Sequence, residues 1–271
     1  MLPRDNPSQL FQTHKENTVF LWKKHKNLGF YAHFHSDLEI YFLLSGEMEA
    51  IINKESYTIK KGEIFVVNQF EIHEYKRTRD ADVAVLILSD NYLTDLKEEY
   101  GNVKMHTLLS DVEYNKGIFS VLKDIPYGMY RNTTLSETAK KGYANLVLDK
   151  IVKHYGFKTE STVTVKVTQI VEYIYNNFTE KITLESLAEK FNYAKTSLSR
   201  MLSPYIKTDL RKFINTLRAE KAELLFNDSE FKDFSTTEIA SICGFESFAT
   251  FYRAYKARFN RLPKKTGLKA D

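Results

Sequence analysis

The sequence predicts an α+β multidomain fold, in which a β-rich N-terminal domain with some following helices precedes an all-α C-terminal domain. Three observations predict this class. Short β-branched and aromatic runs fill residues 19–90, helical patterns fill residues 91–155, and helical periodicity continues from about residue 165 to the end. The length of 271 residues is enough for two ordinary domains.

The N-terminal strands are expected because short apolar runs alternate with turn residues. The runs are TVFLW, IYFLL, MEAIIN, SYTIKKGEIFVVN and DVAVLILS, and the turns fall at Gly29, Gly46, Asn53 and Gly62. Many short strands at this spacing are typical of a β-sandwich or a small β-barrel.

The segment after the strands predicts helices and then a linker. SETAKKGYANLVLDKIVKHY has apolar residues at helical spacing with basic residues between them. We expect the helical segment from about Leu108 to Tyr155 to supply a homodimer interface; the alternative is that its apolar face packs on the chain's own strands. The polar stretch from Gly156 to Thr164 predicts a linker, which divides the chain into domains at residues 1–160 and 165–271.

Two stretches of the C-terminal domain share one pattern: LESLAEKFNYAKTSLSRML and TEIASICGFESFATFYRAYK. Each has an alanine, a turn former four residues later, an aromatic residue and a second short helix with an arginine, as in a helix-turn-helix motif. The turn formers, Asn192 and Gly244, tolerate a left-handed backbone. Ser235 and Glu238 form a capping-box pattern before the second unit. The two predicted helix-turn-helix units are residues 184–203 and 235–257, approximately.

The second helix of each unit is expected to have one buried and one outward face. In the second unit the apolar stripe is Phe248, Phe251, Tyr255 and Phe259. The outward faces combine small or polar side chains with arginine, a combination suited to contact with the major groove of DNA. The alternative is that these faces are merely solvated. The predicted DNA-contacting residues are Thr196, Ser199 and Arg200 in the first unit, and Ala249, Thr250, Arg253 and Lys256 in the second.

The charge distribution indicates a polyanionic partner for the C-terminal half. Residues 1–163 carry a net charge of −1, whereas residues 164–271 carry +5. This favours DNA, although a solvated lysine-rich surface would have the same composition. The single cysteine, Cys243, excludes an internal disulfide and fits the reducing cytoplasm. No apolar run reaches the length of a membrane helix, so no membrane partner is expected.

The stretch SICGFESFATFYRAYKARFNRLP resembles the C-terminal signature of the AraC/XylS family of bacterial transcription regulators. LESLAEKF, LSRML, LRAEKAELLF and the closing Pro263 fall where that family has them. The resemblance implies two helix-turn-helix units on a rigid central helix, with recognition helices in successive major grooves and the residues named above facing the bases. It also implies promoter DNA as a partner, with RNA polymerase as a further one. Two positions depart from the family pattern. Ala194 stands where members of the family often have a helix-capping serine, and SPYIKTDL lacks the glycine that usually follows the first recognition helix.

The stretch HFHSDLEIYFLLSG places two histidines and a glutamate at metal-ligand spacing. If it forms one strand, alternation puts His33, His35, Glu39 and Tyr41 on one face. The pattern resembles the first cupin motif, and Gly62 and His73 match the ends of the second, where Asn68 and Phe70 replace the usual proline and glycine. The resemblance implies a cupin-like sensing barrel with a small-ligand pocket. The expected effector pocket is His33, His35, Glu39, Tyr41 and His73.

The chemistry of this pocket remains open between three interpretations. Three histidines with Glu39 could hold a divalent metal such as zinc, iron, copper or nickel. The same residues could bind a polar effector without metal, or be purely structural. The function expected is a transcription regulator that responds to a small-molecule effector and is not an enzyme. The alternatives are a metal-dependent cupin enzyme fused to a DNA-binding domain, and a constitutive DNA binder whose barrel only mediates dimerisation.

Overall fold

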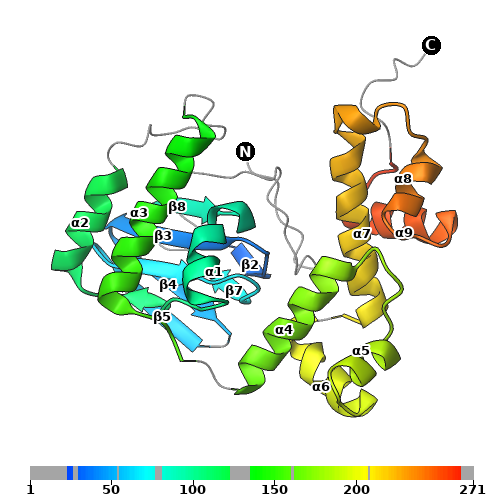
Figure 1. The fold of residues 1–271 in the computed structure, drawn as a ribbon, viewed down its shortest axis with the longest axis horizontal. Coiled ribbons are helices and arrows are strands. Elements are labelled where there is room, and N and C mark those ends of the chain that lie inside the picture. Colours follow the sequence, from blue (N-terminus) through cyan, green and yellow to red (C-terminus); the bar gives the residue numbers. More distant parts are fainter. Residues whose placement is uncertain are drawn as a thin grey trace. The chain divides into compact units, whose positions relative to one another are not determined.

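The structure is a computed structural model that describes residues 23–26, 30–53, 55–76, 81–122, 135–159, 162–206 and 208–263. The described residues divide into two compact units, one ending at Thr159 and the other beginning at Thr162. The first contains all the strands and the second is entirely helical (Figure 1). The predicted α+β class is therefore confirmed. Among the described residues, no helix combines the length and the apolar character needed to cross a bilayer.

The strands of the first unit form two antiparallel sheets. The five-stranded sheet has the order β1 (Lys23–Lys26), β8 (Asp82–Leu88), β3 (Leu38–Ser45), β6 (Ile64–Val67), β9 (Leu108–Leu109). The four-stranded sheet has the order β2 (Phe30–His33), β7 (His73–Tyr75), β4 (Glu47–Ile52), β5 (Glu55–Lys60).

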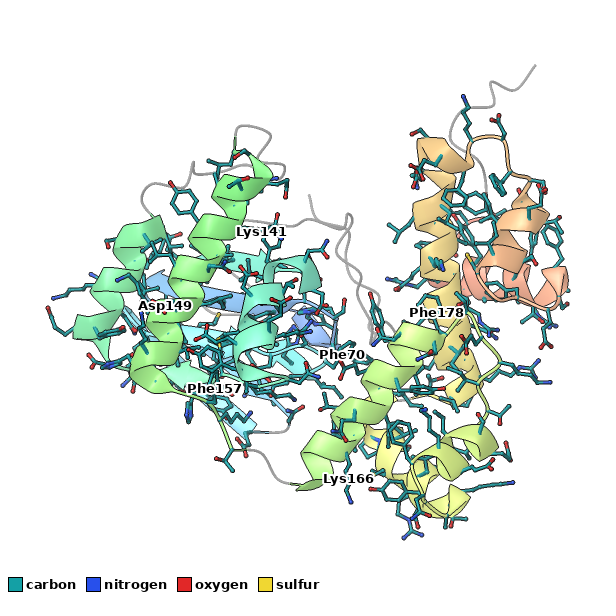
Figure 2. All side chains as sticks on the ribbon, viewed as in Figure 1. Phe70, Lys141, Asp149, Phe157, Lys166 and Phe178 are labelled. Carbon is teal, nitrogen blue, oxygen red and sulfur yellow. The ribbon has the colours of Figure 1, made fainter. Side chains whose placement is uncertain are left out.

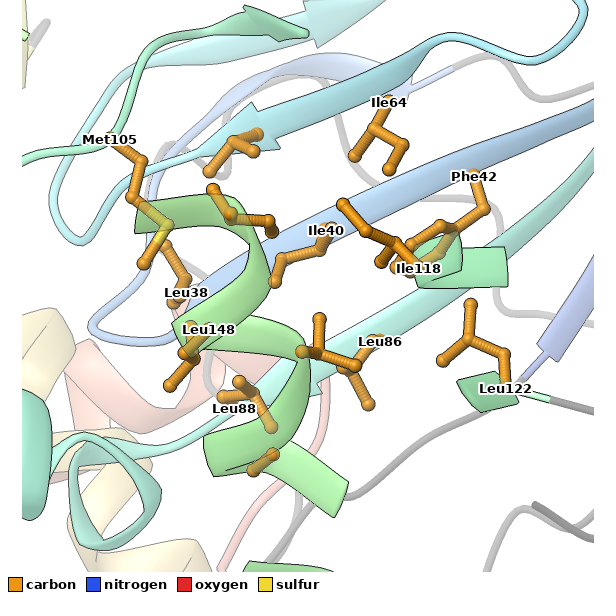
Figure 3. Close-up of a cluster of buried hydrophobic side chains, with 14 of the residues drawn as sticks. Leu38, Ile40, Phe42, Ile64, Leu86, Leu88, Met105, Ile118, Leu122 and Leu148 are labelled. Carbon is orange, nitrogen blue, oxygen red and sulfur yellow. The ribbon is translucent and has the colours of Figure 1, made fainter. Parts of the chain in front are cut away.

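Strand β3 shows why the five-stranded sheet is covered on both sides. Its even-numbered side chains, such as Ile40 and Phe42, join one buried cluster, and the odd-numbered Tyr41 and Leu43 join another. The second cluster draws side chains from both sheets, so it fills the space between them. The first cluster combines the outer face of the five-stranded sheet with residues of the helices that follow (Figure 3). Such two-sided burial explains the almost uninterrupted apolar character of this strand.

The helices that follow the strands cover the outer face of that sheet. They are η1 (Asp90–Tyr92), α1 (Thr94–Tyr100), α2 (Val112–Leu122) and α3 (Glu137–Tyr155). At the start of α3 the Ser136 side chain accepts a hydrogen bond from the Ala139 amide, and the helix is followed by Gly156, which has φ +68°.

The apolar faces of α2 and α3 pack on their own sheet. Ile118 and Leu148 belong to the buried cluster of that sheet. Val112 and Leu146 are the large apolar residues of these two helices that stay exposed, at 42% and 44%. The solvent side of α3 otherwise carries charged residues such as Asp149 (Figure 2). The helical periodicity is therefore accounted for by packing within the unit, and the expected homodimer interface stays a prediction.

The second unit consists of helices joined by short turns. They are α4 (Thr162–Asn177), α5 (Leu184–Lys190), α6 (Lys195–Ile206), α7 (Leu210–Phe226), η2 (Ser229–Phe231), α8 (Thr236–Ile242) and α9 (Phe248–Phe259). Helix α4 begins inside the stretch predicted as a linker, whereas α3 ends where that stretch begins. Residues 160 and 161, within the same stretch, lie outside the described residues.

Both helix-turn-helix turns have the predicted backbone. Asn192 has φ +56° between α5 and α6, and Gly244 has φ +88° between α8 and α9. The predicted capping box of Ser235 and Glu238 is present at α8. A second capping box, of Thr183 and Ser186, begins α5; it was not predicted, because serine at the third helical position is a weaker signal than glutamate.

The second turn packs against the chain that leaves α4. A Cβ atom on Gly244 would clash with the carbonyl oxygen of Thr179. Arg218 of α7 donates hydrogen bonds to the carbonyl oxygens of Phe178 (2.6 Å) and Glu180 (2.7 Å), on either side of Thr179. Behind the turn, the residue before Gly244 is buried in the apolar cluster shared by α7, α8 and α9. The turn is thus fixed by both its dihedral angles and its neighbour.

Replacement of Gly244 by alanine should destabilise the helical unit by about 2–4 kcal/mol, because the left-handed backbone and the carbonyl contact both resist a Cβ atom. Urea unfolding of the full chain, followed by circular dichroism, measures this change in the helical transition. Gly142→Ala is the matched control, since Gly142 is helical with no atom within 4 Å of a new Cβ. It should leave stability unchanged or raise it by about 0.5–1 kcal/mol. Equal effects of the two substitutions would contradict the argument.

Candidate functional site

The histidine motif does not form the single strand that alternation predicts. Strand β2 ends at His33, and β3 begins at Leu38 in the other sheet. His35 lies in the connection between them. His33 is paired with His73 across β2 and β7. The side chains therefore meet from facing sheets and a connecting loop, and not along one strand.

The second half of the motif is shaped by an unusual backbone. Phe70 has φ +61°, at the position where the cupin pattern has glycine. Its amide donates to the carbonyl oxygen of His35 at 2.8 Å, which ties the two loops together. The loop around Phe70 therefore adopts the left-handed conformation without glycine, at a cost of about 1–2 kcal/mol.

The three histidines form a compact buried cluster. His33, His35 and His73 are 4%, 1% and 0% exposed. Their ring centroids lie 4.1 Å (His33 to His73), 4.8 Å (His35 to His73) and 5.8 Å (His33 to His35) apart. One ring nitrogen from each lies within 4.8 Å of the others, a grouping that could hold a metal ion.

Backbone carbonyl groups orient two of these rings. The Nδ1 atom of His35 lies 3.1 Å from the Asp37 carbonyl oxygen, and that of His73 lies 2.9 Å from the Glu71 carbonyl oxygen. Because a carbonyl oxygen only accepts, each Nδ1 carries a proton. Burial, then the neighbouring His33 and His35, lowers the pKa of His73 well below its usual value. The neutral form with an accessible Nε2 lone pair is the one that ligates metals.

Glu39 faces the same two Nε2 atoms. Its carboxylate oxygens lie 3.3 Å from Nε2 of His35 and 3.7 Å from Nε2 of His73. In a neutral ring whose Nδ1 carries the proton, Nε2 is an acceptor, as are the oxygen atoms of a carboxylate. Acceptors that face one another at this distance are stabilised by a cation or by a ligand with hydrogen-bond donors. The donor set therefore fits a divalent cation, and it fits a donor-bearing small molecule equally.

Two tyrosines hold Glu39 from the other side. The hydroxyl groups of Tyr41 and Tyr75 donate to its Oε2 atom at 2.5 Å and 3.3 Å. Burial, followed by the charges nearby, raises the pKa of both tyrosines well above the usual value, so both remain donors. Tyr41 was expected in the pocket, but Tyr75 was not. The sequence did offer a signal for Tyr75. It follows His73 by two residues, and this spacing puts Tyr75 and His73 on one face of β7.

A buried network connects His73 to the end of the first unit. The Glu71 carboxylate accepts hydrogen bonds from the amide and side chain of Asn68 (2.9 Å and 3.1 Å), and pairs with Nζ of Lys158 at 3.1 Å. The Lys158 amide also bonds to the Lys104 carbonyl oxygen. Lys158 lies just before residues 160 and 161, which lead to α4. Nothing in the sequence indicated this contact.

In the helical unit, the predicted DNA-contacting residues lie on outward faces. On α6, Leu198 and Leu202 are buried, and the three predicted residues are exposed. On α9, Phe251 and Tyr255 are buried. Three of the four residues predicted on α9 are exposed, and the fourth, Thr250, is half-buried. Phe248, expected in the apolar stripe, is instead 41% exposed, although its ring lies against those of Phe251 and Tyr252. A hollow beside α6 is lined by Leu184, Lys195, Thr196, Ser199, Arg200, Ser203 and Pro204.

Comparison with known protein families assigns a domain to each unit. Residues 21–89 match the family described as a cupin domain, and residues 187–267 match the family described as a helix-turn-helix domain. The first match covers the strands that carry the histidines. The second covers both predicted recognition helices, α6 and α9.

Similar curated proteins are named as transcription regulators. An uncharacterized HTH-type transcriptional regulator of Staphylococcus aureus (strain COL) is 25% identical over 237 residues, which are 85% of this chain and 31% of that protein. This chain thus spans less than a third of that relative. The HTH-type transcriptional activator RhaS of Salmonella agona (strain SL483) is 23% identical over 244 residues, 87% of each chain.

Among solved structures, ToxT from Vibrio cholerae strain SCE256, with unsaturated fatty acid bound, has a similar fold. The match has a TM-score of 0.50 at 20% identity and covers 96% of this chain and 100% of that one. It supports the order of a β-rich unit followed by a helical unit.

Replacement of Tyr41 by phenylalanine should destabilise the first unit by about 1–3 kcal/mol, because it removes a donor from a buried carboxylate. Tyr57→Phe is the matched control, since Tyr57 also donates to a glutamate two residues earlier, Glu55, but at an exposed position. Its effect should stay under about 0.5 kcal/mol. Urea unfolding of both variants measures the difference. A loss in Tyr41→Phe no larger than that in Tyr57→Phe would contradict the described role of Tyr41.

Proposed function

We propose that this chain, which belongs to the AraC family and joins a cupin domain to a helix-turn-helix domain, is a sequence-specific transcription regulator controlled by a small-molecule effector. The observation that carries the proposal is the repeated helix-turn-helix geometry. Each unit has a left-handed turn followed by a helix with a buried apolar face and an exposed face bearing an arginine.

Promoter DNA is the partner of the helical unit in this proposal. Helices α6 and α9 would enter the major groove, where Arg200 and Arg253 suit the guanine edge and Thr196, Ser199 and Thr250 suit other base edges or phosphates. The net charge of +5 on residues 164–271 supports this choice through attraction to the phosphate backbone.

The cupin unit is the sensor in this proposal. Its three histidines, Glu39 and Tyr41 would contact the effector. The ToxT structure contains an unsaturated fatty acid. In the pocket of this chain an acidic ligand would meet the Glu39 carboxylate, so a cation or a donor-bearing molecule suits this pocket better. If a divalent metal binds, the three histidines with Glu39 would hold it, and it would supply positive charge between their acceptor atoms.

Coupling between the two units requires that the effector bind their active and inactive arrangements differently. The network from His73 through Glu71 to Lys158 supports such coupling, because it joins the pocket to the chain that leads into α4. We infer that the protein is a cytoplasmic homodimer that acts with RNA polymerase and not as an enzyme. The names of its relatives as transcription regulators support the last inference.

Replacement of Arg253 by alanine should weaken binding to a duplex selected by the wild-type protein by about 1–3 kcal/mol, and relax preference at one base pair. Wild-type affinity should fall steeply with salt, because lysines and arginines displace counterions. Fluorescence anisotropy measures both effects. Lys141→Ala, which removes an exposed charge from α3, is the control and should bind as the wild type does. Equal weakening on all sequences would show that Arg253 contacts only phosphate.

Replacement of His73 by glutamine should weaken binding of Zn²⁺ by about tenfold or more. The substitution removes a metal ligand, the imidazole ring whose Nδ1 is held by the Glu71 carbonyl group. Isothermal titration of metal-free, untagged protein measures the affinity. His106→Gln, at an exposed position, is the control and should bind as the wild type does. Absence of Zn²⁺ binding in the wild type would exclude zinc as the effector and favour a donor-bearing molecule. Identical affinity in both variants would place the metal elsewhere.

A further inference from the structure

Two carboxylates of α7 hold the C-terminal end of α9. Oε1 of Glu220 lies 2.5 Å from Nε of Arg258, in the last turn of α9. One turn further along α7, Glu223 pairs with Arg261 at 2.6 Å and accepts a hydrogen bond from the Tyr255 hydroxyl. These contacts fix α9 at several points, so they restrict rotation of the helix about its own axis.

The buried carboxylate of Glu220 lowers the stability of the folded state when it is ionised. It is 2% exposed, and its Oε2 atom has no hydrogen-bond partner among the described residues. Burial raises its pKa to about 7, although Arg258 opposes the shift. The folded pKa is above the ordinary value of 4.5, so the folded state binds more protons between these two pH values. Stability therefore falls as pH rises from 4.5 towards 7, and the full cost is present above that range.

The geometry of α9 relates the buried Glu220–Arg258 pair to the direction of Arg253. Arg253 and Arg258 are five residues apart, so their side chains leave the helix about 140° apart. One is exposed, and the other is held by α7. A replacement of a buried ion pair by apolar side chains is often neutral or stabilising, so such a pair is weak evidence for stability. The pair is better explained by the orientation it imposes.

We propose that Glu220, acting through Arg258, is a positioning residue that sets the rotation of α9 and thereby the direction in which Arg253 meets DNA. The inference rests on the proposed DNA-binding function and adds a residue that touches no DNA. The charged group that faces Glu220 is Arg258 of α9, and the neighbouring Glu223 of α7 contacts Tyr255 and Arg261.

The test is Glu220→Gln in the full chain, with two measurements at pH about 8, where Glu220 is charged. The helical unit should stay folded, as measured by its thermal transition, because the side-chain oxygen of glutamine can still accept a hydrogen bond from Nε of Arg258. Affinity for the duplex selected by the wild type should fall about tenfold, while affinity for an unrelated duplex of equal length should not change. Glu230→Gln, an exposed change of the same charge, is the control and should bind as the wild type does.

A pH profile supplies a readout that a merely structural role would not give. The seven histidines of the chain all precede residue 164, and the pKa of Glu220 is raised to about 7, so Glu220 is a group of the described helical unit that titrates between pH 6 and 8. Wild-type preference for the selected duplex should fall as pH drops through this range, and Glu220→Gln should flatten the profile.

A second variant protects the test against a folding failure. Glu220→Met with Arg258→Met replaces the ion pair by apolar side chains, and should fold while losing preference for the selected duplex. Unchanged preference in Glu220→Gln would overturn the inference, and so would unfolding of both variants, which would make the pair structural. A wild-type protein that binds no duplex at all would instead overturn the proposed function.

Discussion

Burial of strand β3 on both faces is the constraint on which the first unit depends. Its buried apolar side chains alternate between two cores. The apolar even-numbered side chains require a cover, which α2 and α3 supply. The odd-numbered face carries Glu39 into the space between the sheets, where an ionised carboxylate is costly unless donors surround it. The tyrosines and histidines around Glu39 are therefore a consequence of where the strand runs, as much as of any ligand.

Periodic features of the sequence predicted most of the fold. Alternation and apolar runs predicted the strands, and helical spacing with turn formers predicted both helix-turn-helix units, including the left-handed Asn192 and Gly244. The histidines of the motif lie together, but they come from two strands and a connecting segment and not from one strand as expected. Alternation describes a strand that stays in one sheet, and it cannot reveal that the chain changes sheets between His33 and Leu38.

Features that depend on distant parts of the chain were not predictable. The contact between Glu71 and Lys158 joins residues 87 positions apart, and no local sequence pattern around either residue predicts the pairing. The same limit applies to α2 and α3. Their periodicity predicts that one face is buried but does not say against what, and the structure places that face on the unit's own sheet. Glu220 likewise resembles an ordinary helix residue until α9 is packed against it.

The position of Cys243 has a consequence for redox chemistry. It lies at the end of α8, fully buried beside the turn that carries Gly244, and burial raises its pKa to about 12. The thiolate is the form that reacts with oxidants and alkylating reagents, and the raised pKa leaves little of it at neutral pH. The helical unit should therefore tolerate peroxide without sulfenic acid forming in its core. Any response of this protein to oxidants would have to begin elsewhere in the chain.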